Sequence, residues 1–175
     1  MDSTLESTLV ARAKISNSTS LNNSSLPLPD LTWMSSLILL KSTNDMINPS
    51  IYNFTIQGAA TADIMSCSGA GINASYAIID NCLITNNVSA RHGGGIYGRY
   101  LEIRNSIITS NNASNGMDRR GGGIFFSGGS NLIENSEISY NNSSTGNGWG
   151  IGGGIYNLTG SVTINNSIII GNSSS

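Results

Sequence analysis

The sequence predicts an all-β fold, a single-stranded parallel β-helix (a solenoid) of about four to five rungs. The first observation behind this prediction is a repeat with fixed landmarks. Its asparagines recur at intervals of 24, 30 and 31 residues. They form two columns: Asn81, Asn105, Asn135 and Asn166, and Asn87, Asn111, Asn141 and Asn172. Fixed landmarks at variable spacing indicate a constant rung with loops of different length inserted into it.

The second observation is the type of residue within the repeat. Helical repeats need apolar residues at i, i+3, i+4 and i+7 and few glycines. This chain has 21 Gly among its 175 residues, and isoleucine, asparagine and serine dominate the repeat. Isoleucine favours strands, whereas glycine, asparagine and serine favour tight turns. The repeat unit is therefore built from strands and corners.

The third observation is the spacing of isoleucines within one copy. Ile79 and Ile84 lie five positions apart, so a straight strand would point them to opposite faces. A corner at Asn81, a residue type that tolerates left-handed backbone, returns both to the interior. The equivalent pairs in later copies are Ile103 and Ile108, Ile133 and Ile138, and Ile164 and Ile169.

Three segments follow along the chain. Residues 1–30 are rich in serine and asparagine without apolar periodicity, which predicts poor order. Residues 31–50 contain a short apolar run that suits either an N-terminal cap helix or a degenerate rung. Residues 51–175 form the β-helix repeats, and we expect the array to continue beyond Ser175 because the last copy stops just after its second asparagine.

Composition narrows the function classes. Only 10% of residues are charged and the net charge is −2, so no general attraction to nucleic acid or to an anionic membrane is expected. The start of the chain carries Asp2 and Glu6 and does not resemble a signal peptide. The apolar run from Leu31 to Leu40 is shorter than a membrane span.

The cysteines and glycines indicate structure, with no metal and no cofactor. Cys67 and Cys82 match no zinc motif. Cys82 occupies a column that holds serine in later copies, which favours a small buried thiol over a bridge to Cys67. Triple glycines begin at Gly93, Gly121 and Gly152, but the lysine and helix of a phosphate-binding loop are missing. We interpret them as tight turns where neighbouring rungs approach closely.

Several runs carry a resemblance to a known family. The segments LEIRNSIITSNN, IYNFTIQGA, GGGIY and GGGIF resemble the right-handed parallel β-helix repeats of large surface or secreted proteins, the pectate-lyase-like superfamily in the wide sense. They are loosely similar to polymorphic outer-membrane protein repeats, although Ile-x-x-Asn stands where that family has Phe-x-x-Asn. The resemblance implies a right-handed solenoid and an extracellular or cell-surface location.

A surface for ligands is expected beside the triple glycines. The residues after each Gly-Gly-Gly-Ile should point outward and stack one rung apart, and loops should bring cationic and aromatic side chains to the same edge. The aromatic strip consists of Tyr97, Phe125 and Tyr156. The flanking residues are Arg91, His92, Arg119, Arg120 and Trp149. Aromatic faces suit sugar rings, and arginine can grip carboxylates in a bidentate fork.

Other columns should face outward as well. Asp80, Arg104 and Glu134 follow an inward isoleucine in successive copies and predict a surface ion-pair ladder. An apolar stripe of Leu83, Ile107 and Ile168, interrupted by Glu137, predicts a lateral contact with another chain or domain.

Two functions follow from these expectations. The first is a surface scaffold with an adhesive or glycan-binding role. The alternative is a remnant of a polysaccharide lyase or glycoside hydrolase of this fold. The resemblance would place clustered aspartates, calcium or a Gly-His-Gly motif in such an enzyme. The chain has Arg91, His92 and Gly93 in a similar position, and no catalytic residue is identified.

Overall fold

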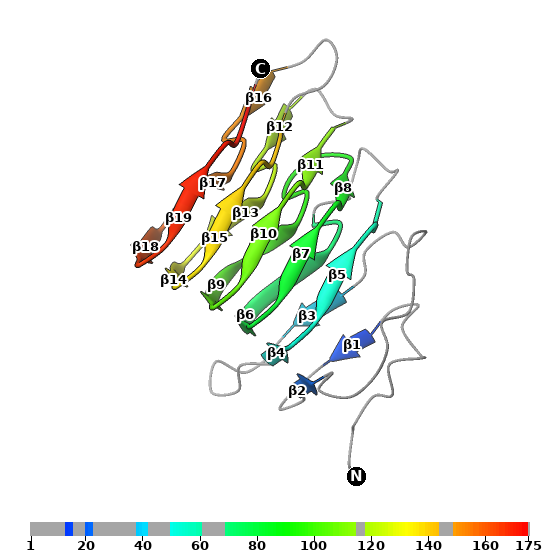
Figure 1. Ribbon diagram of the computed structural model, residues 1–175, viewed down its shortest axis with the longest axis vertical. Helices are drawn as coiled ribbons and strands as arrows, with labels where there is room; N and C mark the ends of the chain where they lie inside the picture. The colour runs from blue at the N-terminus through cyan, green and yellow to red at the C-terminus, as the bar shows by residue number, and fades with distance from the viewer. Residues whose placement is uncertain are drawn as a thin grey trace.

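The computed structural model shows an all-β parallel β-solenoid of about four turns. No helix occurs in the part of the chain that it describes. Figure 1 shows the strands of successive turns stacked side by side along one axis. The structure describes residues 13–15, 20–22, 38–41, 50–60, 69–114, 118–143 and 149–174.

The largest sheet runs along one side of the solenoid. Its long central strands are β6 (Ile72–Asp80) and β9 (Ile96–Arg104), which pair in parallel from Ile72↔Ile96 to Asp80↔Arg104. In the next two turns the equivalent strand is divided in two. These pieces are β13 (Ile124–Gly128), β14 (Ser130–Glu134), β17 (Ile155–Asn157) and β18 (Ser161–Asn165).

A second sheet of five parallel strands faces the viewer in Figure 1. Its strands are β5 (Thr55–Gln57), β7 (Leu83–Thr85), β10 (Ile107–Thr109), β15 (Glu137–Ser139) and β19 (Ile168–Ile170). Two small parallel pairs complete the turn. They are β8 (Val88–Ser89) with β11 (Asn112–Ala113), and β12 (Asp118–Arg120) with β16 (Trp149–Ile151).

The N-terminal part also contributes strands to the first sheet. Within the segment expected to be poorly ordered, β1 (Ala13–Ile15) and β2 (Ser20–Asn22) are strands. Within the segment expected to be a cap or degenerate rung lies β3 (Ile38–Lys41), which pairs in parallel with β1 and β6, and β4 (Ser50–Tyr52) pairs with β2 and β6. The remaining residues before Ser50, and Cys67, lie outside the described residues.

Positive φ angles mark four corners in each rung. One corner holds the first asparagine column: Asn53, Asn81, Asn105, Asn135 and Asn166, with φ from 45° to 59°. The second holds Gly58, Asn86, Ser110, Tyr140 and Gly171, and the third holds Gly69 and the first glycine of each triplet. The fourth holds Tyr76, Tyr100, Gly129 and Gly160. Left-handed backbone favours glycine and asparagine, so the corner residues explain where each rung bends.

The interior is a stack of isoleucines. The predicted inward pairs Ile79 and Ile84, Ile103 and Ile108, and Ile133 and Ile138 are all fully buried. The pair of the last described turn, Ile164 and Ile169, is 42% and 48% exposed. The triple glycines allow close approach between rungs, as predicted. A Cβ on Gly122 would collide with the carbonyl oxygens of Asn142 and Gly153.

The second asparagine column forms a continuous buried ladder. The Asn111 Oδ1 atom accepts hydrogen bonds from the backbone N–H and the Nδ2 of Asn87, at 3.0 and 2.9 Å. Asn111 in turn donates to Asn141, and Asn141 donates to Asn172, with the same geometry. Each Nδ2 also donates to a strand carbonyl, as Asn111 does to Ile84 at 2.9 Å.

The first asparagine column differs from the ladder that we predicted there. All its members are exposed, because the left-handed corner turns their side chains toward solvent. Asn81 Nδ2 donates to Asn53 Oδ1, but Asn105 Nδ2 donates to Asp80 Oδ1 at 2.8 Å. The ladder at this corner is made by the next residue. Ser106 Oγ and Ser136 Oγ accept the backbone N–H groups of Cys82 and Ser106, each at 3.1 Å.

Candidate functional site

Three aromatic rings from successive rungs stack beside the triple-glycine corner. The pairing of β9, β13 and β17 aligns Tyr97, Phe125 and Tyr156 in one row. The ring centroids of Tyr97 and Phe125 are 5.2 Å apart with planes inclined by 7°. Those of Phe125 and Tyr156 are 5.4 Å apart and inclined by 20°. The parallel register therefore turns a sequence repeat into a continuous aromatic stack.

The middle of this stack is covered. Phe125 is only 3% exposed, and the imidazole of His92 stacks on it with centroids 4.6 Å apart and planes inclined by 16°. The expectation of an open strip across all three rings is therefore wrong at Phe125. Tyr97 and Tyr156 remain half-buried. A ligand can reach the ends of the stack, but it cannot reach the face of its central ring.

His92 is held in its neutral form. Burial lowers its pKa from 6.5 to about 4, and the nearby Arg91 and Arg120 lower it further, whereas Asp118 opposes the shift. The imidazole Nδ1 is buried and has no hydrogen-bond partner. A neutral, stacked imidazole of this kind serves as packing for Phe125 more readily than as a charged ligand contact.

The arginines of the adjoining loop strand divide between two faces. Alternation along β12 turns Asp118 and Arg120 to one side and Arg119 to the other. Arg119 is 4% exposed, so its assignment to the surface site is corrected. Arg120 Nε donates to Asp118 Oδ1 at 2.7 Å, and its guanidinium carbon lies 5.1 Å from the ring centroid of Tyr156. The side chain of Arg91 is half-buried.

The most exposed aromatic side chain among those described belongs to this edge. Trp149 is 84% exposed. The pairing of β12 with β16 places it opposite Asp118, and places Ile151 opposite Arg120. Trp149, Asp118, Arg120 and Tyr156 thus form a cluster, which we call the Trp149 edge. It joins an open indole, a carboxylate, a guanidinium and a phenol ring.

The Trp149 edge has the chemistry of a polar ring-binding surface. The indole and phenol rings offer apolar faces with negative quadrupole potential. The guanidinium supplies donors in a fixed fork, and the carboxylate supplies acceptors. Hydroxyl groups on a ring-shaped ligand could pair with both while its C–H groups lie against an aromatic face.

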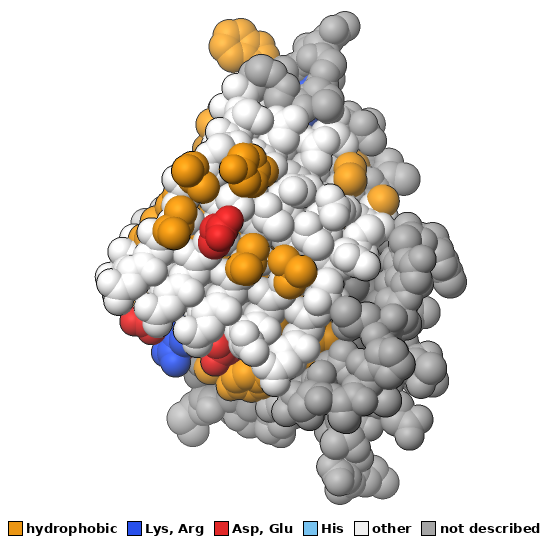
Figure 2. All heavy atoms as spheres, in the orientation of Figure 1, with side chains coloured by type: hydrophobic (Ala, Val, Ile, Leu, Met, Phe, Trp, Pro, Cys, Tyr) orange, Lys and Arg blue, Asp and Glu red, His pale blue; other side chains and the backbone are white. Residues whose placement is uncertain are grey.

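The predicted lateral stripe lies on the five-stranded sheet. Register aligns Leu83, Ile107, Glu137 and Ile168 in one row across β7, β10, β15 and β19. Figure 2 shows scattered hydrophobic side chains with one acidic group among them on this otherwise uncharged face. Ile107 and Ile168 are 43% and 59% exposed, and Leu83 is half-buried.

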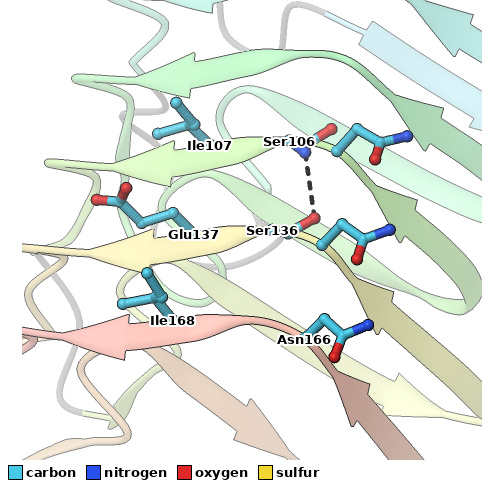
Figure 3. Close-up of a pocket in the computed structure, with 8 residues that line it drawn as sticks. Ser106, Ile107, Ser136, Glu137, Asn166 and Ile168 are labelled. Atoms are coloured by element: carbon cyan, nitrogen blue, oxygen red, sulfur yellow. Dashed lines mark hydrogen bonds between the residues drawn. The ribbon is translucent and has the colours of Figure 1, made fainter.

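A shallow groove follows the corner beside this stripe. Its walls are the exposed asparagines of the first column and the outward side chains of the stripe. Figure 3 shows Ile107, Glu137 and Ile168 projecting from successive strands, with the Ser106–Ser136 hydrogen bond at the corner. The groove presents uncharged amides and aliphatic groups, with Glu137 as the carboxylate of the stripe.

The predicted ion-pair ladder is not formed across strands. Arg104 Nη2 donates to Glu102 Oε2 on its own strand at 2.7 Å, with both side chains well exposed. Asp80 instead accepts a hydrogen bond from Asn105. Among the residues that the structure describes, no three His, Cys, Asp or Glu side chains gather in a way that could hold a metal ion. None of the described segments is a helix able to cross a membrane.

Cys82 is a free, buried thiol. Burial raises its pKa to about 11. Its Sγ lies 3.3 Å from the carbonyl oxygen of Asp80, the contact that Ser106 Oγ makes with the carbonyl of Arg104 in the next rung. Cysteine therefore replaces serine at this corner as a weak donor, in agreement with the interpretation from sequence.

The comparisons with protein-family models, with curated proteins and with solved structures gave no significant match for this chain. The structure shows a parallel β-solenoid of about four turns. The functional argument therefore rests on the residues of this chain alone.

One aromatic pair was missed by the sequence analysis. Tyr76 and Tyr100 stack with ring centroids 4.4 Å apart and planes inclined by 7°. Both have left-handed backbone, with φ of 55° and 53°. Their common position five residues before Asn81 and Asn105 was the available signal. It was overlooked because the third and fourth copies carry serine there.

The conformation of this pair is costly. Left-handed backbone costs an L-residue about 1–2 kcal/mol, so two tyrosines lose about 2–4 kcal/mol relative to glycine. An aromatic stack returns only about 0.5–1.5 kcal/mol beyond area burial. Tyr100 remains 41% exposed, which limits what burial adds. Strained residues of this kind gather at functional positions in proteins.

Proposed function

We propose that this protein is an extracellular or cell-surface β-solenoid scaffold that binds a glycan at the Trp149 edge. The observation that carries the proposal is the exposed indole of Trp149, aligned on paired strands with an Asp118–Arg120 ion pair whose guanidinium lies over Tyr156. An exposed tryptophan has a large apolar area in water. A ligand that covered it would remove that area from solvent.

A carbohydrate fits this surface better than a peptide or a nucleic acid. The groups beside the indole are one cation and one anion already paired with each other, so the edge has little net charge for steering a polyphosphate. Pyranose rings present C–H groups on a face and hydroxyls at the rim. The edge supplies an aromatic face with donors and acceptors beside it.

The solenoid provides a rigid support for such a site. The buried asparagine ladder and the serine ladder tie each rung to the next through side chains as well as backbone. Sites on strands are held more closely than sites on free loops. The resemblance to surface β-helix proteins agrees with a scaffold role.

The alternative, a remnant of a lyase or hydrolase, receives less support from the site. A glycoside hydrolase needs two carboxyl groups flanking the bond to be cleaved. The Trp149 edge has Asp118 alone, and that carboxylate is paired with Arg120 at 2.7 Å. Ion pairing stabilises the charged form of a carboxylate, which opposes its use as a general acid.

The test is binding to a glycan array that contains neutral and uronic-acid oligosaccharides, followed by titration of the best binder. Trp149→Ala should weaken binding at least about tenfold, because truncated aromatic anchors commonly cost more than 1 kcal/mol. Tyr140→Gly is the matched control, since it removes another exposed aromatic ring, 65% exposed, at a different corner. An array without any binder would contradict the proposal, as would equal affinity for Trp149→Ala and the unaltered protein.

A further inference from the structure

The second aromatic stack ends in a step. Tyr76, Tyr100, Gly129 and Gly160 occupy the same corner in successive rungs. The two tyrosine rings stack in parallel 4.4 Å apart, but the next two rungs have glycine at this corner. The ring of Tyr100 therefore has an aromatic neighbour on the Tyr76 side, whereas the rung above contributes no side chain at its corner.

The glycines keep this step open. A Cβ on Gly129 would lie 2.8 to 2.9 Å from Cγ, Cδ1 and Cε1 of the Tyr100 ring. A Cβ on Gly160 would collide in the same way with the backbone of Gly129. Any larger residue at position 129 would therefore push against the ring. The ring reaches past Gly129 into solvent and is 41% exposed at the residue level.

We propose that the open part of the Tyr100 face is a second sugar subsite, in which a pyranose ring takes the place of the missing third ring of the Tyr76–Tyr100 stack. The proposal rests on the glycan-binding role proposed above and adds a site to it. The C–H groups of a pyranose face complement the negative face of a phenol ring. A glycine step gives room for one ring against the stack.

Polar groups lie on the two sides of Tyr100. Arg99 precedes it and is exposed, and the two ion pairs of the described part of the chain do not involve Arg99. Ser130 begins the next strand and is also exposed. A guanidinium can donate to the hydroxyl or carboxylate oxygens of a sugar.

The two sites share one face of the solenoid. Tyr97 of the first stack and Tyr100 of the second lie on the same strand, β9, three residues apart. An extended chain covers about 10 Å in three residues. An oligosaccharide of several units could therefore bridge the Trp149 edge and the Tyr100 step, and two linked contacts would bind more tightly than either one alone.

The test replaces the strained tyrosine by the residue that its backbone favours. Tyr100→Gly should keep the fold and raise the thermal midpoint, because glycine adopts positive φ without strain. It should also lower affinity for the best array oligosaccharide at least tenfold. Tyr100→Phe, which keeps the ring, should retain binding. Tyr140→Gly, a tyrosine in the same left-handed conformation at another corner, should leave affinity unchanged.

The outcomes separate the two sites. Loss of binding in Trp149→Ala with unchanged binding in Tyr100→Gly would overturn the Tyr100 subsite and leave the proposed function standing. The reverse pattern would support the subsite and overturn the Trp149 edge. Transfer of magnetisation from tyrosine ring protons to sugar C–H protons should appear in the unaltered protein and weaken in Tyr100→Gly. Absence of any oligosaccharide binder would overturn both.

Discussion

At the scale of single residues, the same amino acid performs two different tasks one short strand apart. Asn105 is exposed at a left-handed corner, where its backbone conformation is the useful property. Asn111 is buried, and its amide links three rungs through donors and an acceptor that are all paired. Only the second task requires the asparagine side chain.

This difference predicts opposite responses to truncation. Asn111→Ala removes the acceptor for the Asn87 N–H group and the donor for the Ile84 carbonyl, and each buried group left unpaired costs about 1–3 kcal/mol. We expect a loss of about 3 kcal/mol or more in the free energy of unfolding, measured by urea denaturation. Asn105→Gly should change it by less than about 1 kcal/mol. Similar losses at both positions would contradict the buried ladder.

A second residue-scale prediction concerns acid. His92 has a pKa of about 4 in the fold, below its ordinary 6.5, so the unfolded chain takes up the proton first as pH falls. The stability that depends on neutral His92 is therefore complete above pH 6.5 and is lost between pH 6.5 and 4. The full shift corresponds to about 3 kcal/mol, and solvent screening of the half-buried ring reduces it to about 1–2 kcal/mol.

The measurement is the urea midpoint at pH 7 and pH 5, above the range where carboxylates titrate. His92→Phe keeps a ring on Phe125 and removes the titrating group. The variant should therefore show a smaller fall in stability over this interval than the unaltered protein. A fall of equal size in both would mean that the acid sensitivity comes from another group.

At the scale of elements, the alternation along β10 decides which isoleucine is structural. Ile108 is fully buried, whereas its neighbour Ile107 is 43% exposed. Replacing Ile108 by Asp would place an unpaired charge in the isoleucine stack, and we expect the rungs around it to unfold. Ile107→Asp should cost less than about 1 kcal/mol. Circular dichroism on heating compares the two, and equal loss would show that the register of β10 is wrong.

At the scale of the whole molecule, the outward stripe of Leu83, Ile107 and Ile168 is proposed as a lateral contact with a second copy of the chain. The side chains lie in one row on a face with few charges. If two molecules pair through this face, the sedimentation coefficient should rise with protein concentration, and Ile107→Lys should prevent the rise. A coefficient independent of concentration would remove the hypothesis.

The sequence determined the solenoid because its information is periodic. The asparagine columns, the isoleucines five positions apart and the triple glycines each recur in every copy, so the columns of the fold could be read by aligning the copies. Stacking at constant register then follows from backbone pairing and from the buried asparagines. The inward isoleucines and the second asparagine ladder were predictable for this reason.

Only the tertiary structure decided which repeated side chains are accessible. The stack of Tyr97, Phe125 and Tyr156 follows from register, but the cover of His92 over Phe125 arises across the glycine corner and has no repeat in the sequence. The burial of Arg119 depends on the direction in which β12 leaves its loop. The strained Tyr76–Tyr100 stack depends on backbone angles that propensity opposes. Repetition fixes what lies in each column, whereas the non-repeating loops and corners fix what a ligand can reach.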